Sequence, residues 1–306
     1  MDGCVLITGE VDRTTEFERG MSPIHQPSTG SDRQQDALVL DNQALVVHVA
    51  GRGQVTPSAL IRSPPMTLLL VHGGGFSSSC WDRTVTHLRS PAVAVDLPGR
   101  GSRPDDLAKV TIDDFAAAVV SEIESRDLHD VVLVGHSLAG LTLPRVVGRV
   151  PERLAGVVFV SCCVPPHGRS TLEHLGHQEV RELAEHAPIS EPGPPAVLDA
   201  DLATAIFCND MDAETTAYTL SIMGPESAGV VREAMDLSGM SAPVPRTWAR
   251  LTRDVIVTPD QQDASIAALG ETDVVDLDSG HMAMISRPRE LAAILDRLHG
   301  AYATRP

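Results

Sequence analysis

The sequence has 306 residues, of which 42% are hydrophobic and 21% are charged, a balance typical of globular proteins and unlike that of a disordered chain. Lys and Arg number 24 against 41 Asp and Glu, so the net charge is −17 at pH 7. Nucleic acids and anionic membranes are bound through clustered basic charge. The composition therefore argues against nucleic acid and membrane as partners.

The cysteines and the N-terminal residues predict an intracellular location. The five cysteines are an odd number without a repeated pair spacing, which favours reduced, buried thiols over disulfides or a metal site. The chain begins Met1-Asp2-Gly3-Cys4, without the basic segment and apolar core of a signal peptide. No apolar run approaches the roughly 18 residues that a spanning helix needs. We therefore expect a cytoplasmic protein.

The first 36 residues are expected to form an N-terminal arm or flexible leader, because residues 20–36 are polar and rich in Gly, Pro and Ser. From Ala37 onward, short apolar runs recur between turn residues, and each run predicts a strand. Residues 67–71, 131–134 and 157–160 lack polar alternation, which is typical of parallel strands that are buried on both faces. The predicted strands are Leu38–Leu40, Ala44–Val49, Thr67–Val71, Ala92–Val95, Asp130–Val134, Val157–Val160, Thr247–Leu251 and Val274–Leu277.

Helical patterns alternate with these strands. Residues 112–125 carry apolar side chains at i, i+3 and i+4 spacing, and Thr111 followed by Asp114 predicts a capped helix start. Residues 138–150 and 290–298 have a similar pattern. The alternation predicts an α/β fold with a mostly parallel, doubly wound sheet.

Residues 164–243 interrupt the alternation, because they contain no run typical of a buried strand and are rich in Pro, Gly and Met. This insertion after the sixth predicted strand is interpreted as a helical cap over the C-terminal edge of the sheet, where open α/β sheets bind ligands. The expected core domain is then residues 37–163 and 244–306. Helices are predicted within the cap at 171–186, 199–207, 212–223 and 226–236.

The most informative string is Gly135-His136-Ser137-Leu138-Ala139, which joins the predicted strand at 131–134 to a helix. A serine nucleophile needs a tight strand-to-helix turn with small residues on either side, so that its Oγ projects above the sheet. The helix N-terminus also favours negative charge beside Ser137. Ser137 is the predicted nucleophile.

A second strand, at 67–71, ends in His72-Gly73-Gly74-Gly75. Glycines at this place let backbone N–H groups approach a ligand, and acyl transfer needs two such groups at the oxyanion. We expect them to come from Gly74 and from Leu138, the residue after the nucleophile. A phosphate-binding loop is disfavoured because no Lys-Ser/Thr pair follows.

The general base is predicted to be His281, which follows the last strand late in the chain, whereas His72 and His136 are interpreted as structural. The chain order for this fold is Ser, acid, His. The candidate acids are Asp254, Asp260 and Asp263. We prefer Asp254, because the strand at 247–252 then ends just before it and Pro259 is well placed to begin the next helix.

These strings resemble the α/β-hydrolase superfamily over roughly residues 37–303, and within it the branch of esterases, plant methylesterases and hydroxynitrile lyases. Residues 245–254 resemble that branch's strand leading to Thr-x-Asp, which implies Asp254 as the acid. The strings that carry the resemblance are Val71-His72-Gly73-Gly74-Gly75 with Trp81, Gly135-His136-Ser137-Leu138-Ala139-Gly140, and Gly280-His281-Met282-Ala283-Met284 with Pro288 and Leu291.

The predicted function is a serine hydrolase of carboxylic esters that uses no metal or cofactor. A lactonase is the nearest alternative, and a ligand-binding protein that retains the triad is another. Lyases of the branch have Thr where this chain has Gly73 and Lys where it has Met282, which disfavours hydroxynitrile lyase activity. The expected partner is a small ester or lactone, and a homodimer is possible. The residues expected to line the substrate pocket are Gly73, Gly75, Trp81, Leu220, Met223 and Met282.

Overall fold

The protein was examined as a computed structural model that describes residues 35–40, 43–50, 54–57, 66–175 and 198–304. It divides into two units, residues 1–64 and 65–306. The smaller unit contains an antiparallel sheet of β1 (Gln35–Leu40), β2 (Gln43–Ala50) and β3 (Gln54–Pro57).

This division differs from the expected domain boundary at residue 37. The runs at 38–40 and 44–49 do form strands, β1 and β2, but they belong to the three-stranded sheet and not to the core sheet. Leu40 pairs with Gln43 across the short connection, and strands joined so closely can pair only in antiparallel fashion. Most of the leader expected at 1–36 lies outside the described residues.

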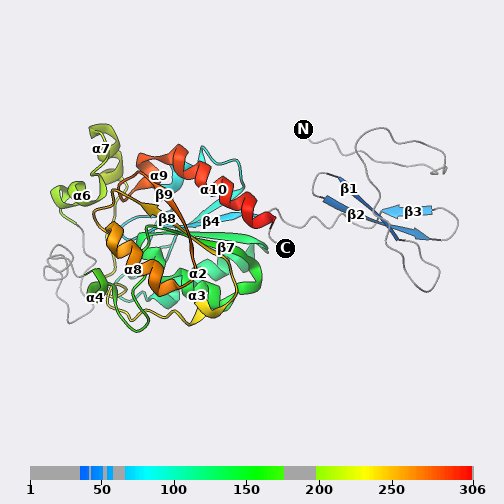
Figure 1. The fold of residues 1–306 in the computed structure, drawn as a ribbon, viewed down its shortest axis with the longest axis horizontal. Coiled ribbons are helices and arrows are strands. Elements are labelled where there is room, and N and C mark those ends of the chain that lie inside the picture. Colours follow the sequence, from blue (N-terminus) through cyan, green and yellow to red (C-terminus); the bar gives the residue numbers. More distant parts are fainter. Residues whose placement is uncertain (1–34, 41–42, 51–53, 58–65, 176–197, 305–306) are drawn as a thin grey trace. The chain divides into compact units, whose positions relative to one another are not determined.

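The larger unit is built on a six-stranded, fully parallel sheet with the order β5-β4-β6-β7-β8-β9 (Figure 1). The chain passes from β4 outward to β5 and then returns to the other side of β4, so the strand order reverses between β4 and β6. Crevices at such reversals bind ligands. The strands are β4 (Leu68–Val71), β5 (Ala92–Val95), β6 (Val131–His136), β7 (Leu154–Val160), β8 (Arg246–Leu251) and β9 (Asp273–Leu277).

The strand predictions from Thr67 onward are confirmed, each to within three residues at either end. Every residue of β4 and β6 is buried, as expected for strands covered on both faces. The strand before the insertion, β7, is the fourth strand of this sheet rather than the sixth, because β1 and β2 lie in the other sheet.

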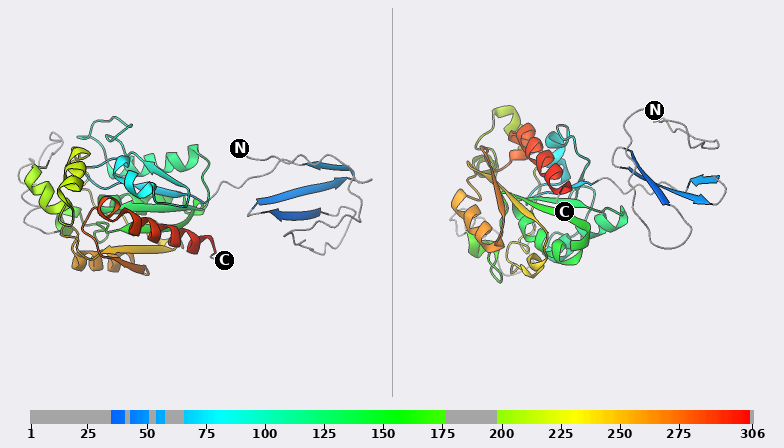
Figure 2. Two further views of the ribbon diagram at one scale, coloured as in Figure 1. Left: turned by 90° about the horizontal axis from the view of Figure 1, so that it is seen from above. Right: turned by 45° about the vertical axis from the view of Figure 1, so that its right-hand side comes forward.

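Helices cover both faces of the sheet (Figure 2), and the sheet divides the core into two apolar clusters. One cluster joins Leu69 and Leu133 to α2, α3 and α8. The other joins Leu68 and Val132 to η1 and to the C-terminal helices. Alternate strand residues therefore serve opposite faces. The covering helices are η1 (Ser78–Trp81), α1 (Asp82–Val85), α2 (Ile112–Ser125), η2 (Ser137–Leu141), α3 (Leu143–Arg149), η3 (Pro151–Arg153), α8 (Pro259–Leu269), α9 (Ala283–Ser286) and α10 (Pro288–Ala303).

The three helix predictions in the core are confirmed, with one local difference. Thr111 caps α2 through a reciprocal capping box with Asp114, as the sequence predicts. The helix expected at 138–150 begins instead as the 3-10 helix η2 and continues as α3.

Within residues 164–243 the described part is helical in three pieces and irregular elsewhere. The pieces are α4 (Thr171–Leu175), α6 (Ala200–Phe207) and α7 (Ala213–Ser221), followed by the 3-10 helix η4 (Ser238–Ser241). The predictions at 199–207 and 212–223 are confirmed, and the rest of 171–186 lies outside the described residues. The helix predicted at 226–236 is wrong, because the backbone there forms turns. Of the helices described here, none is long and apolar enough to cross a membrane.

Candidate active site

Ser137 sits on a sharp turn between β6 and η2. Its φ is +52°, in the left-handed region that side chains rarely adopt. A Cβ on Gly135 would lie 2.7 Å from Leu143 Cδ1, and one on Gly140 would lie 2.4 Å from the Cys163 carbonyl oxygen. Small residues are therefore required on both sides of the turn, which is the local reason for the Gly-x-Ser-x-Ala-Gly pattern.

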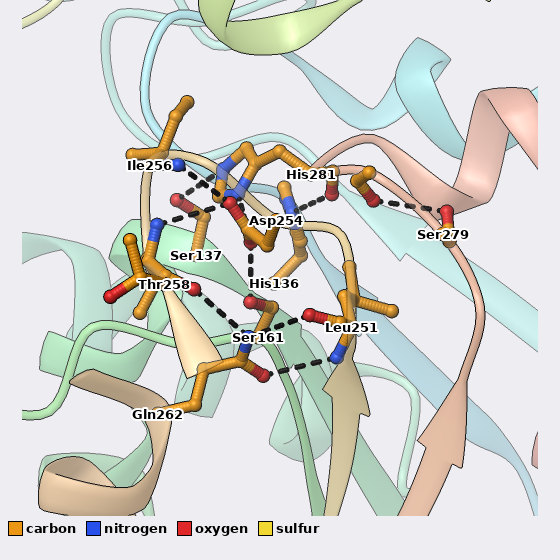
Figure 3. A network of polar contacts seen from close by, with 12 residues as sticks. His136, Ser137, Ser161, Leu251, Asp254, Ile256, Thr258, Gln262, Ser279 and His281 are labelled. Atoms are coloured by element: carbon orange, nitrogen blue, oxygen red, sulfur yellow. Dashed lines mark hydrogen bonds and ion pairs between the residues drawn. The ribbon is translucent and has the colours of Figure 1, made fainter. Parts of the chain in front are cut away.

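Ser137, His281 and Asp254 form one hydrogen-bond chain at the C-terminal edge of the sheet (Figure 3). His281 Nε2 is 2.9 Å from Ser137 Oγ, and His281 Nδ1 is 2.6 Å from Asp254 Oδ2. Ser137 follows β6, Asp254 follows β8 and His281 follows β9. The structure thus brings together three residues that lie up to 144 positions apart in the sequence.

Asp254 is buried and its carboxylate is saturated with donors. Oδ1 accepts hydrogen bonds from the backbone N–H groups of Ile256 and Val257 at 2.8 and 3.0 Å, and Oδ2 accepts from His281 and from Ser161 Oγ at 2.6 and 2.5 Å. These four donors hold the carboxylate in one orientation.

The other two candidate acids are placed elsewhere. Asp260 is exposed in the first turn of α8, and Asp263 pairs with Arg250 at 2.7 Å. Residues 255–258 are not a strand in the structure, so no strand ends just before Asp260.

Ser161 is a site residue that the sequence reasoning missed. It is fully buried at the end of β7 with φ +39°, and its hydroxyl donates to Asp254 Oδ2 (Figure 3). Its position directly after a buried strand is the available signal, since the carboxyl ends of parallel strands share one edge.

His72 and His136 both form hydrogen bonds to backbone groups, as expected for structural histidines. The hydrogen bond of His136 crosses the site. Its Nε2 is 2.9 Å from the carbonyl oxygen of His281 and donates to it. Burial lowers the pKa of His136 well below its ordinary value, and nearby His281 lowers it further. Burial lowers the pKa of His72 to about 4, so it stays neutral at pH 7 and accepts from Leu97 N at 3.2 Å.

The glycine loop after β4 lies directly against the nucleophile. A Cβ on Gly73 would be 2.9 Å from Ser137 Cβ, and one on Gly74 would be 3.1 Å from Leu138 Cδ2. Gly73, Gly74 and Leu138 also line one pocket. The two residues expected to donate to an oxyanion, Gly74 and Leu138, are therefore neighbours.

Glu226, from the segment after α7, holds the glycine loop in place. Its Oε2 accepts from Gly75 N at 2.8 Å, and its Oε1 is 2.5 Å from Nη2 of Arg100, whose side chain is only 4% exposed. Gly224 N also donates to the Gly75 carbonyl at 2.7 Å. The irregular backbone at 224–226 thus contacts the glycine loop directly.

We expect Glu226→Gln to lower the free energy of unfolding by about 2–3 kcal/mol, because it leaves the Arg100 guanidinium without its counter-charge. Breaking a fully buried pair costs about 3–5 kcal/mol, and the Glu226 side chain is 21% exposed, which reduces the loss. Urea unfolding measures the effect. Glu124→Gln removes the same charge from the exposed surface of α2 and should change the stability by less than about 0.5 kcal/mol. Equal stability of the two variants would contradict the assigned role of the pair.

Apart from the two glycines, Gly73 and Gly75, the residues expected to line the substrate pocket fall into two groups. Trp81 and Met282 are fully buried in the apolar cluster beneath the site. Leu220 and Met223 are partly buried at the edge of that cluster, and Met223 Cγ would be 3.9 Å from a Cβ on Gly75. Phe207 of α6 was not among the expected pocket residues, but its ring centroid is 5.7 Å from that of His281, so it lies beside the base.

Comparisons with known proteins agree with this fold. Residues 68–294 match the model of the alpha/beta hydrolase family, and the chain belongs to that family. It is 26% identical to Methylesterase 17 of Arabidopsis thaliana over 76% of this chain and 91% of the relative. It is also 26% identical to a probable esterase of Oryza sativa subsp. indica, over 76% and 97%.

Solved structures show the same fold. An extracellular α/β-hydrolase from a Paenibacillus species superposes with a TM-score of 0.70 at 23% identity, covering 76% of this chain and 98% of the other. A methylesterase from Arabidopsis superposes with a TM-score of 0.62 at 19% identity, covering 77% and 99%. These superpositions show the fold, and the esterase and methylesterase relatives confirm the resemblance to that branch.

Proposed function

We propose that the protein hydrolyses carboxylic esters of largely apolar small molecules. The observation that carries the proposal is the continuous hydrogen-bond chain from Ser137 through His281 to Asp254, with the nucleophile on a strained turn. The same three residue types in this geometry activate serine for acyl transfer on several unrelated folds. The esterase and methylesterase relatives support the same reaction class.

The proposed reaction proceeds through an acyl-enzyme. His281 Nε2 accepts the proton of Ser137 as Oγ attacks the ester carbonyl, and Asp254 stabilises the imidazolium. The N–H groups of Gly74 and Leu138 bind the oxyanion. The imidazolium then gives its proton to the leaving alcohol, and water activated by His281 releases the acid.

The apolar nature of the substrate is inferred from the apolar side chains that lie beside the glycine loop and the base. Met223 lies beside Gly75, and Phe207 lies beside His281. Met side chains are flexible and polarisable, so they adapt to apolar groups of different shape. A cyanohydrin is disfavoured as a substrate, because Gly73 supplies no hydroxyl and Met282, a buried thioether, supplies no positive charge.

The direct test is hydrolysis of a panel of nitrophenyl esters and lactones by the purified protein, together with labelling by a fluorophosphonate. We expect turnover of esters and one covalent adduct, located at Ser137 by mass spectrometry. A protein that binds panel members without turnover and without labelling would instead be a ligand-binding member of the family.

We expect Met223→Ala to change the ranking of substrates by size, because it removes apolar volume beside the glycine loop. The ratio of kcat/KM for a long-chain to an acetyl ester should change by about 5- to 30-fold, which corresponds to the ~1–2 kcal/mol of one or two methylene contacts. The matched control is Met66→Ala, at the start of β4 and therefore at the opposite edge of the sheet. Equal scaling of all esters by Met223→Ala would assign this side chain to packing alone.

A further inference from the structure

Two consecutive residues after α6 contact the loops that carry both the acid and the base. Asn209 Nδ2 donates to the carbonyl oxygen of Arg253 at 2.9 Å, and Arg253 directly precedes Asp254. Asp210 Oδ2 accepts from Gly280 N at 2.9 Å, and Gly280 directly precedes His281. The pair therefore joins the loop after β8 to the loop after β9 from a third segment of the chain.

The Asp210 carboxylate is held firmly. Its side chain is 1% exposed, and Oδ2 also accepts from Ser286 Oγ at 3.0 Å and from Ser279 Oγ at 3.4 Å. The guanidinium groups of Arg253 and Arg287 lie 3.7 and 3.8 Å away. Positive charge and converging donors on both sides fix the carboxylate in one position.

The packing around Gly280 is close, and it leaves one buried polar atom without a hydrogen bond. A Cβ there would lie 2.3 Å from Asn209 Oδ1 and 2.7 Å from Asp210 Oδ1. Asp210 Oδ1 is itself buried without a hydrogen-bond partner in the described part of the chain, and such an orphaned acceptor is unfavourable.

We propose that Asn209 and Asp210 are positioning residues that set the contact between His281 and Asp254, an inference that rests on the proposed function. The two loops also contact each other directly. Arg253 N donates to the Ser279 carbonyl at 3.0 Å, and the Arg253 side chain donates to the Asp278 carbonyl at 3.2 Å and pairs with the Asp278 carboxylate at 2.7 Å. The His281–Asp254 contact at 2.6 Å depends on the separation of these loops. Displacements of about 1 Å at such contacts cost about 10²-fold in rate.

The test compares Asp210→Ala, Asp210→Asn and Asn209→Ala. Asp210→Ala leaves Gly280 N–H without its acceptor, and we expect kcat for a nitrophenyl ester to fall by about 10- to 100-fold with KM within about twofold. Asp210→Asn keeps an acceptor oxygen and should recover most of the rate. Asn209→Ala should lower kcat by about 10-fold. Active enzyme is counted by fluorophosphonate titration, so that loss of folded protein does not enter kcat.

The matched control is Asp212→Ala, two positions further along. Asp212 accepts from Thr215 N at 2.8 Å and caps α7, so its loss destabilises the same segment by about 1 kcal/mol without touching either loop. A kcat equally reduced in Asp212→Ala and Asp210→Ala would overturn the proposal. Should Asp210→Ala not fold, Asn209→Ala decides, because Asn209 is exposed.

A readout without turnover separates this inference from the proposed function. The proton on His281 Nδ1, shared with Asp254, gives a far-downfield proton NMR signal when the contact is short. We expect the signal to shift upfield or broaden in Asp210→Ala and in Asn209→Ala, but not in Asp212→Ala. An unchanged signal in both site variants refutes the positioning role. An absence of ester turnover in the unmodified protein refutes the proposed function and leaves this measurement valid.

Discussion

Replacing Ser137 by Ala is expected to lower kcat for ester hydrolysis by about five to six orders of magnitude, as removal of the nucleophile does in other serine hydrolases. Ser137 Oγ is the atom to which His281 is hydrogen-bonded, and no acyl-enzyme can form without it. The residual rate would come from the oxyanion donors and substrate binding, which act without the serine. Steady-state turnover and fluorophosphonate labelling measure the loss.

The fold should survive this substitution, because Ala fits wherever Ser137 does and the turn is held by Cys163 N donating to the Ser137 carbonyl at 2.9 Å. The control is Ser241→Ala, an exposed serine at the end of η4, which should retain full activity and labelling. Ester hydrolysis at close to the unmodified rate by the Ser137→Ala variant would remove the basis of the proposed function.

The second large effect is expected for Asp254→Asn, at about 10⁴-fold in kcat, by analogy with the loss of the triad aspartate in serine proteases. Oδ1 faces the fixed N–H donors of Ile256 and Val257, so the Asn oxygen will take that place. Its NH₂ group then faces His281 Nδ1 and forces that nitrogen to be an acceptor. The proton moves to Nε2, which can no longer accept the proton of Ser137.

Asp260→Asn is the matched control, because Asp260 is an exposed carboxylate in the first turn of α8. It should change kcat by less than about twofold. Single-turnover rates with a nitrophenyl ester separate acylation from substrate binding. Acylation is the step that the wrong tautomer of His281 slows. A greater loss in Asp260→Asn than in Asp254→Asn would mean that Asp254 does not act as the acid.

The core elements could be predicted from sequence because each is specified locally. Runs such as Val131–Val134 are apolar at every position, and the Thr111–Asp114 capping box begins α2 at the expected residue. The three residues of the hydrogen-bond chain could be chosen from the sequence for a related reason. Each follows a strand, and parallel strands deliver their carboxyl ends to one edge.

Other features could not be predicted because they depend on contacts between distant segments. Residues 226–236 have apolar residues at helical spacing, yet Glu226 bonds to Gly75 and Arg100, and this tertiary contact replaces helix formation. Intrinsic helix preference is worth only tenths of a kcal/mol per residue, so tertiary bonds override it. The strands at 35–50 likewise carry strand-forming residues, but nothing in their pattern says which sheet they join.

The sequence by itself determined the strand-helix alternation, the turn at Ser137 and the three residues that form the hydrogen-bond chain, because these depend on short strings and on strand ends. Only the tertiary structure decided that Ser161 donates to Asp254, that His136 holds the His281 carbonyl, and that Asn209 and Asp210 join the two loops. These bonds link residues between 44 and 145 positions apart. Chain separation on that scale leaves no signal that says which residues pair, since the pairing is created only when the sheet brings its strand ends together.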